Sequence, residues 1–365
     1  MRIFVIIGTR PEAIKMLPLV RELRKHSQFE TKICFSHQHE KMAQDVFSDF
    51  EIYPDFTFDG MKRGMNLSEI TVAYLKYFDM IFKMEKPDLV LSHGDTTTAF
   101  CASLSAFYLG IPVGHIEAGL RTFDNLSPFP EEFNRVGIDE ISKLCFAPTD
   151  TAAENLRKEG RKSVFTVGNT VIDALKYSLS GKVDLPFSDE LKDKKLLLVT
   201  THRRENIGTK MRSALLGIRD ILEEYDDTFA ILPAHPNPMV AETVNDVFQN
   251  IKNIKICAPM PMRDFHTLLC RAFAVFTDSG GIQEEAAYLG IPLFLIRDNT
   301  ERPECVLSQN VRVVGTDRDM VKNAFELFLN DASLREKMRT PSSVFGDGCA
   351  SEKITDILLQ FYHKS

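Results

Sequence analysis

Apolar runs alternate with amphipathic segments throughout the first half of the chain. Short runs dominated by apolar residues predict buried strands at residues 1–7, 32–36, 88–92, 112–116 and 143–147. Apolar residues at helical spacing predict helices at residues 13–25, 40–47, 67–84, 99–109 and 151–158, and a further helix that begins at Glu131. Strands that alternate with helices in this way predict a parallel sheet with helices on both faces.

The second half repeats the alternation. Strands are predicted at residues 196–200, 229–232, 254–257, 274–276, 292–296 and 311–314, with helices between them and at 319–329 and 354–362. A polar stretch at 178–195 is expected to be a linker or a surface excursion, and we place the domain boundary near Gly168 and Asn169. The pattern therefore predicts an α/β protein with two doubly wound domains.

Length and composition agree with two domains in a reducing compartment. A chain of 365 residues exceeds what one hydrophobic core usually supports. The net charge is −7 with no basic block, so we expect no nucleic-acid or anionic-membrane binding. The seven cysteines are scattered and form no CxxC pair, which disfavours disulfides or a zinc site and favours a cytoplasmic location. No run approaches the roughly 18 to 20 apolar residues of a membrane span.

One stretch of the second half is typical of an anion site. Residues 277–285 follow an apolar run and predict a strand, a tight loop and the start of a helix. Gly280 and Gly281 let the backbone approach a ligand, and the free N–H groups of the first helical turn would face a phosphate or diphosphate. Glu285 lies about one turn further, where it could accept hydrogen bonds from ribose hydroxyls. Alternatively, Asp278 or Ser279 is an ordinary N-cap.

In the first half, charged residues gather where predicted strands end. Asp95 and Glu117 follow two successive strands, on the edge where open α/β sheets bind ligands, although Asp95 could simply cap a helix. Glu131 begins a helix and could merely complement its dipole. Arg10 and Lys15 lie where a helix dipole does not favour cations. They are therefore either solvated surface charges or part of an anion site.

Loops of the second half add further candidates. His202 lies on a predicted strand-to-helix loop, so both a ligand-binding or catalytic role and a structural role stay open. His235 is more ambiguous because the neighbouring prolines alone explain a rigid turn. With Arg302, these groups suit a nucleotide sugar, whose diphosphate needs cations and whose ring needs acids and bases. We expect no metal, because the carboxylates are spread over separate loops and no HExxH occurs.

Seven segments together resemble the non-hydrolysing UDP-N-acetylglucosamine 2-epimerases. They occur in that family's order over nearly the whole chain: residues 8–16 (GTRPEAIKM), 93–98 (HGDTTT), 115–121 (HIEAGLR), 168–174 (GNTVIDA), 202–206 (HRREN), 277–285 (TDSGGIQEE) and 300–304 (TERPE). The resemblance implies two Rossmann-like domains of the GT-B kind with the active site in the interdomain cleft. It implies an N-terminal domain of residues 1–168 plus a C-terminal helix, 348–365, and a UDP-binding domain of residues 169–347.

The resemblance also implies a reaction and a set of roles. The reaction is reversible C2 epimerisation of UDP-N-acetylglucosamine to UDP-N-acetylmannosamine through 2-acetamidoglucal and UDP, without a cofactor, in a homodimer that serves polysaccharide synthesis. The implied catalytic groups are Asp95, Glu117, Glu131 and His202. The implied substrate contacts are Arg10, Lys15, Phe265, Ser279, Gly280, Gly281, Glu285 and Arg302.

Three other functions remain compatible with these residues. A GT-B-type UDP-sugar glycosyltransferase would share the diphosphate loop but would not need Asp95, Glu117 and Glu131 together, and it would require an acceptor. A hydrolysing epimerase would release free N-acetylmannosamine. A UDP-sugar sensor would bind tightly without turnover.

Overall fold

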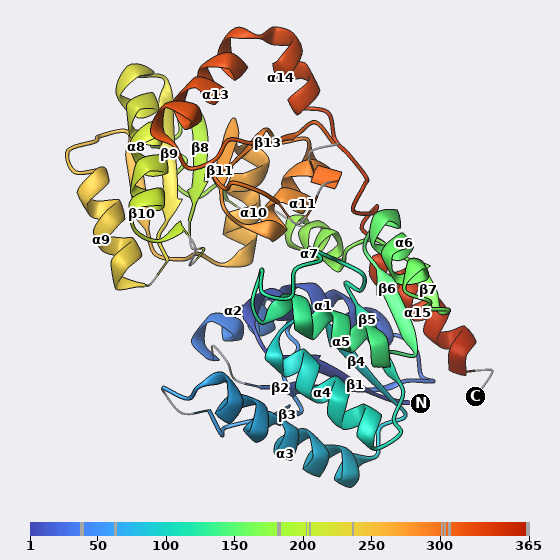
Figure 1. The fold of residues 1–365 in the computed structure, drawn as a ribbon. Coiled ribbons are helices and arrows are strands. Elements are labelled where there is room, and N and C mark those ends of the chain that lie inside the picture. The colour runs from blue at the N-terminus through green and yellow to red at the C-terminus, as the bar shows by residue number, and fades with distance from the viewer. Residues whose placement is uncertain are drawn as a thin grey trace. The chain divides into compact units, whose positions relative to one another are not determined.

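The computed structural model describes residues 1–36, 40–61, 64–180, 184–201, 203, 206–235, 237–300, 302, 304–305 and 308–362. These residues form two compact units, which are considered separately below (Figure 1). The first unit comprises Met1–Tyr177 and Phe345–Ser365, and the second comprises Ser178–Val344.

The first unit is built on a seven-stranded sheet whose neighbouring strands run parallel, in the order β3-β2-β1-β4-β5-β6-β7. Its strands are β1 (Arg2–Ile7), β2 (Glu30–Phe35), β3 (Phe56–Thr57), β4 (Leu89–His93), β5 (Val113–Ile116), β6 (Leu144–Ala147) and β7 (Val164–Thr166). Its helices are α1 (Arg10–Leu23), α2 (Glu40–Phe50), α3 (Leu67–Glu85), α4 (Thr97–Tyr108), α5 (Glu131–Ile141), α6 (Asp150–Lys158), most of α7 (Thr170–Leu179) and α15 (Ala350–Tyr362).

The second unit has a six-stranded parallel sheet in the order β10-β9-β8-β11-β12-β13. Its strands are β8 (Lys195–Thr200), β9 (Thr228–Pro233), β10 (Ile254–Cys257), β11 (Ala274–Thr277), β12 (Leu293–Leu295) and β13 (Val311–Val313). Its helices include α8 (Thr209–Glu224), α9 (Pro238–Val247), α10 (Met262–Arg271), α11 (Gly280–Leu289), α13 (Arg318–Asn330) and α14 (Ala332–Met338). The expectation of two doubly wound α/β sheets is confirmed.

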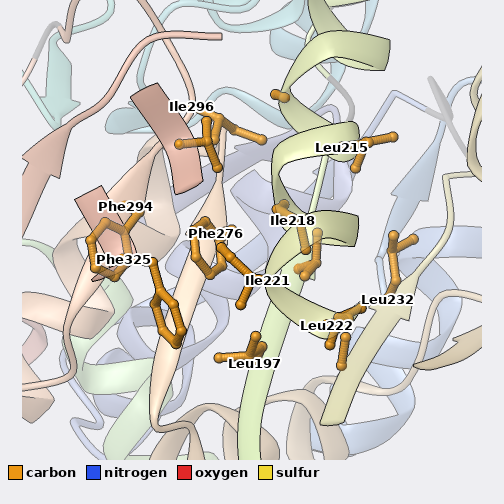
Figure 2. Packing of buried hydrophobic residues seen from close by; sticks show 14 of the residues in the cluster. Leu197, Leu215, Ile218, Ile221, Leu222, Leu232, Phe276, Phe294, Ile296 and Phe325 are labelled. Atoms are coloured by element: carbon orange, nitrogen blue, oxygen red, sulfur yellow. The ribbon is translucent and has the colours of Figure 1, made fainter. Parts of the chain in front are cut away.

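Aromatic packing fills the core of the second unit. Figure 2 shows Phe276 of β11, Phe294 of β12 and Phe325 of α13 gathered together, and the Phe276 and Phe294 rings stack with centroids 5.0 Å apart. Ile218 and Ile221 of α8 belong to the same buried cluster. Because each fully buried side chain of this size contributes roughly 1.5–3 kcal/mol, this packing anchors the strands whose ends carry the candidate site.

Both sheets have a switch point where the strand order reverses, between β1 and β4 and between β8 and β11. Loops that leave the carboxyl ends of such neighbouring strands diverge to opposite faces and leave a crevice, where α/β proteins bind ligands. At the second switch point the hydroxyls of Thr200 and Thr277, paired in register, lie 2.6 Å apart. The candidate residues therefore follow strands at a favourable position in each unit.

The chain returns to the first unit through a close backbone contact. The Asn169 N–H donates to the Phe345 carbonyl at 2.7 Å, and a Cβ at Gly168 would lie only 2.9 Å from the Gly346 Cα. The Asp173 carboxylate accepts hydrogen bonds from the first backbone N–H groups of α15. Because most of α7 is thus tied to the first unit, the structure divides the chain after Tyr177 and not at the expected Gly168.

In the described part of the chain, no helix combines the length and the apolarity that crossing a membrane requires.

Candidate functional site

The loop after β1 is fixed by a buried carboxylate. Thr9 caps α1 and forms a capping box with Glu12, whose carboxylate also accepts hydrogen bonds from Gly8 N at 2.9 Å and from the Thr96 hydroxyl at 2.7 Å. Glu12 thereby joins the loops that follow β1 and β4 across the switch point. Burial raises the pKa of Glu12 to about 7. Arg10 is the first residue of α1 and follows Thr9 directly in the sequence. It is half-buried.

Glu117 lies at the end of β5 in a left-handed backbone conformation, with a φ of 65°. Its Oε2 forms a buried ion pair with Lys15 of α1 and accepts a hydrogen bond from Asn169 Nδ2 at 2.8 Å. His93 Nε2, at the end of β4, lies 3.6 Å from the same oxygen. Burial lowers the pKa of His93 to about 3, so its ring is neutral. Because Lys15 is buried, the alternative of a solvated surface charge is wrong for it.

The turn that carries Glu117 is clamped by Asp139 of α5. One Asp139 oxygen lies 2.6 Å from His115 Nδ1, and the other accepts from Gly119 N at 3.1 Å and lies 2.8 Å from Arg121 Nη1. Burial alone would raise the pKa of Asp139, but the charges of His115 and Arg121 outweigh it and lower that pKa. Asp139 thus contacts residues on both sides of Glu117, and these contacts hold the left-handed backbone conformation in place.

Asp95 follows β4 and pairs with α5. Its Oδ2 lies 2.5 Å from Arg135 Nη2, and its backbone carbonyl accepts from Asn134 Nδ2 at 2.9 Å. The N-cap of α4 is Thr96, whose hydroxyl accepts from Ala99 N, so the alternative of helix capping by Asp95 is wrong.

Glu131 is the first residue of α5 and lies one helical turn before the Arg135 that holds Asp95. Its carboxylate is half-buried, and within the described residues it makes no hydrogen bond or ion pair. Its neighbour Glu132 is instead fully buried and accepts hydrogen bonds from Thr122 N and Phe123 N. Glu131 therefore remains available to a ligand.

In the second unit, Arg302 lies against the first turn of α11. Its Nε donates to the buried Glu284, and its Nη1 would be only 2.6 Å from a Cβ at Gly280. A side chain at Gly280 would therefore displace the guanidinium. Gly281 faces open space. Ser279 occupies the N-cap position without a side-chain capping bond, so its hydroxyl is not used as an ordinary cap.

Asp278 connects the loops after β8 and β11. This fully buried carboxylate accepts hydrogen bonds from the Thr201 hydroxyl at 3.1 Å, from Arg203 N at 3.0 Å and from Asn206 Nδ2 at 3.2 Å. The role of an N-cap for α11 therefore does not describe Asp278. His202, expected in this loop, lies outside the described residues.

Glu285 lies in α11 and is almost fully buried. Its Oε1 is 3.2 Å from His266 Nε2 of α10, and Ser178 Oγ is 2.5 Å from His266 Nδ1. Phe265, which precedes this histidine, is half-buried, and its ring makes a T-shaped contact with the imidazole. The sequence did not single out His266, because a histidine on an amphipathic helix gives no signal of a distant partner.

The structure thus brings Lys15 together with Glu117 in the first unit, and Arg302 together with Gly280 in the second. The candidate site also includes charged or polar residues that were not predicted from the sequence: Asn169, Arg135, Asp139, His93 and His266. Within the described ranges, no group of three or more His, Cys, Asp or Glu side chains could hold a metal ion.

The chain is similar in sequence to known proteins. Residues 21–359 match the family model described as UDP-N-acetylglucosamine 2-epimerase. A protein of that name from Bacillus subtilis is 43% identical over 364 residues, which cover 99% of this chain and 96% of the relative.

Solved structures agree in fold. The crystal structure of UDP-GlcNAc 2-epimerase from Neisseria meningitidis bound to UDP-GlcNAc superposes with a TM-score of 0.94 at 39% identity, covering 99% of this chain and 100% of that one. The glycosyltransferase SnogD from Streptomyces nogalater, with a TM-score of 0.61 at 14% identity and 99% coverage of both chains, shares only the fold, which is GT-B-like. With a family model that matches most of its length and a relative at 43% identity, the chain belongs to the UDP-N-acetylglucosamine 2-epimerase family.

Proposed function

We propose that the chain reversibly inverts C2 of UDP-N-acetylglucosamine and forms UDP-N-acetylmannosamine. The observation that carries this proposal is the buried Glu117, paired with Lys15 at the end of β5, with Asp95 after the neighbouring strand β4. Two acids that follow adjacent strands suit proton transfer at a sugar carbon. The N. meningitidis relative, which binds UDP-GlcNAc, supplies the substrate class.

The chemistry favours elimination before proton return. The C2 hydrogen is not next to a carbonyl group, so direct deprotonation would leave a poorly stabilised carbanion. Cleavage of the C1–O bond first gives that region oxocarbenium character, which acidifies C2–H, while the bonding electrons leave with UDP. Loss of the C2 proton then gives 2-acetamidoglucal. Protonation of C2 on the opposite face and re-addition of UDP at C1 complete the inversion without any net loss of atoms.

The two units would divide this task. In the second unit, the first turn of α11 and Arg302 would bind the diphosphate, since backbone N–H groups and a guanidinium stabilise the departing anion. The proposed contacts there are Ser279, Gly280, Gly281 and Arg302 for the diphosphate, Glu285 for the ribose, Phe265 for the uracil and His202 beside the diphosphate. In the first unit, Asp95, Glu117 and Glu131 would handle the C2 proton, with Arg10 and Lys15 beside them.

Incubation with UDP-N-acetylglucosamine in D2O, with no acceptor and no added NAD, tests the reaction. Deuterium at C2 together with UDP-N-acetylmannosamine, followed by proton NMR, is the expected result. Free N-acetylmannosamine with UDP would instead establish a hydrolysing enzyme. An unchanged C2 signal would refute the proposal, and turnover only after adding a sugar acceptor would establish a glycosyltransferase.

We also propose that the chain works as a homodimer in the cytoplasm and supplies a precursor of surface polysaccharide. The seven cysteines are all free, which supports a reducing compartment. Large apolar side chains are exposed on adjacent helices of the first unit: Met80 and Met84 of α3, and Phe107 and Tyr108 of α4. Such a surface is typical of an interface between subunits.

Light scattering after size-exclusion chromatography tests the dimer. Phe107→Asp with Met80→Asp is expected to give a monomer, because both changes place a charge in the proposed interface. Phe123→Ser with Leu126→Ser, two exposed apolar residues of a loop, is the matched control and should remain dimeric. A monomeric wild-type chain would contradict the homodimer.

A further inference from the structure

His266 links Ser178 with Glu285 through two buried polar contacts, all within the second unit. Its side chain comes from α10, Ser178 belongs to the last turn of α7, and Glu285 belongs to α11. His266 is 2% exposed, Ser178 is fully buried and Glu285 is 6% exposed. Polar side chains that are so far withdrawn from water are costly unless their hydrogen bonds are made, so this row of contacts has to be satisfied internally.

The partners determine where the protons lie. The Glu285 carboxylate can only accept, so His266 Nε2 carries the hydrogen and donates to it over 3.2 Å. In the tautomer with its hydrogen on Nε2, the Nδ1 atom accepts a hydrogen bond from the Ser178 hydroxyl over 2.5 Å. Every donor in the row Ser178–His266–Glu285 therefore points toward Glu285.

This arrangement leaves one carboxylate oxygen uncommitted. His266 is the hydrogen-bond partner that the Glu285 carboxylate has among the described residues, and it engages Oε1. Glu285 also lies about one and a half turns from the start of α11, on the helix whose first turn approaches Arg302. A carboxylate held by one oxygen presents the other in a defined direction, which is what recognition of a ligand hydroxyl requires.

We propose that His266 is a positioning residue for nucleotide binding. Held by Ser178, its ring fixes Oε1 of Glu285 and leaves Oε2 to accept a hydrogen bond from a ribose hydroxyl of the uridine nucleotide. This inference rests on the proposed function, which assigns the ribose to Glu285. It adds two buried residues that contact no ligand themselves and act through Glu285.

The test measures binding of UDP, 2′-deoxy-UDP and 3′-deoxy-UDP by calorimetry. Wild type should bind one of the deoxy ligands roughly 10- to 100-fold more weakly than UDP, the loss expected for a hydrogen bond to a charged group. His266→Leu should bind UDP more weakly by a similar factor and should no longer distinguish it from that deoxy ligand. His266→Gln, whose amide can still donate to Glu285, should recover much of the difference, and Ser178→Ala should fall between these variants.

Thr267→Val is the matched control, because Thr267 is the next residue of α10 and its hydroxyl bonds only within that helix. Thermal unfolding of each variant establishes that it is folded. If a folded His266→Leu distinguishes the ligands as wild type does, or if Thr267→Val loses the distinction equally, His266 is not the positioning residue. The epimerase assay is a separate measurement, so loss of the proposed reaction and loss of this ribose contact are distinguishable.

Discussion

Lys15 and Glu117 pair their charges where both side chains are nearly inaccessible to water, with 9% and 8% of their side-chain surface exposed. The two residues come from different βα units and are separated by 102 positions. A buried charge without its partner is strongly destabilising, whereas the intact pair contributes modestly by itself. The pair therefore makes the local fold depend on the same side chains that the proposed reaction uses.

Lys15→Met is expected to destabilise the protein by about 3–5 kcal/mol, because it leaves the Glu117 carboxylate buried without its cation. The loss of kcat/KM should be roughly 100-fold or more. Urea unfolding at neutral pH measures the first effect. The double variant Lys15→Met with Glu117→Gln should be clearly less destabilised than the sum of the single variants. Strictly additive costs would show that the two charges do not interact.

Glu12 should make stability depend on pH. Its pKa is about 7 in the folded protein and near the ordinary glutamate value of 4.5 in the unfolded chain, so the folded state holds the proton more tightly. The contribution of Glu12 to the free energy of unfolding is therefore fully present below pH 4.5 and is lost as the pH rises through 7. We expect Glu12→Gln, which cannot titrate, to gain about 2–3 kcal/mol relative to wild type between pH 5 and pH 8.

Urea unfolding of both proteins at several pH values provides the measurement for Glu12. Glu22, a partly exposed acid near the other end of α1, offers a matched control as Glu22→Gln. A difference between wild type and Glu12→Gln that stays constant from pH 5 to pH 8 would contradict the prediction.

Asp139→Asn is expected to destabilise by about 3–5 kcal/mol and to lower activity, because the charges of His115 and Arg121 lose their buried partner and the Glu117 turn loses its clamp. The low pKa of Asp139 means that its contribution is present above the unfolded pKa and declines under acid. Glu159→Gln removes the more exposed partner of Arg121 and should cost less than about 1 kcal/mol. Equal costs for the two variants would contradict this difference.

Gly280→Ala and Gly281→Ala separate an effect on the free protein from an effect on the ligand. The first methyl group would contact Arg302, so the variant should lose stability without nucleotide and bind UDP at least about 10-fold more weakly. The second methyl faces open space, so stability without nucleotide should be unchanged or slightly higher, while UDP affinity should fall because the diphosphate is proposed to bind there. Thermal unfolding and calorimetry give the two readings. Equal melting temperatures for the two variants would contradict the placement of Arg302.

Sequence periodicity predicted most of the elements because strand and helix patterns are local. The strand expected at 254–257 has those bounds, and short elements such as β3, β7 and α14 were missed because few residues carry their pattern. Among the candidate site residues, Asp95 and Glu117 could be proposed from the sequence because they follow predicted strands. Their partners could not, because Arg135 and Asn169 lie 40 and 52 positions away from the groups they bind. The amphipathic pattern of α5 also gives no sign that Arg135 is buried.

The contact between Gly168 and Gly346 has a consequence for synthesis. Since the first unit is completed by residues 345–365, whose helix α15 packs on α1, it stays unfinished while the ribosome makes residues 178–344. The second unit is continuous in sequence and can fold as it emerges. Until Ile354 and Leu358 of α15 arrive, the apolar surface they cover is open to solvent. The nascent chain therefore completes the unit that is proposed to bind the nucleotide before the unit that is proposed to transfer protons.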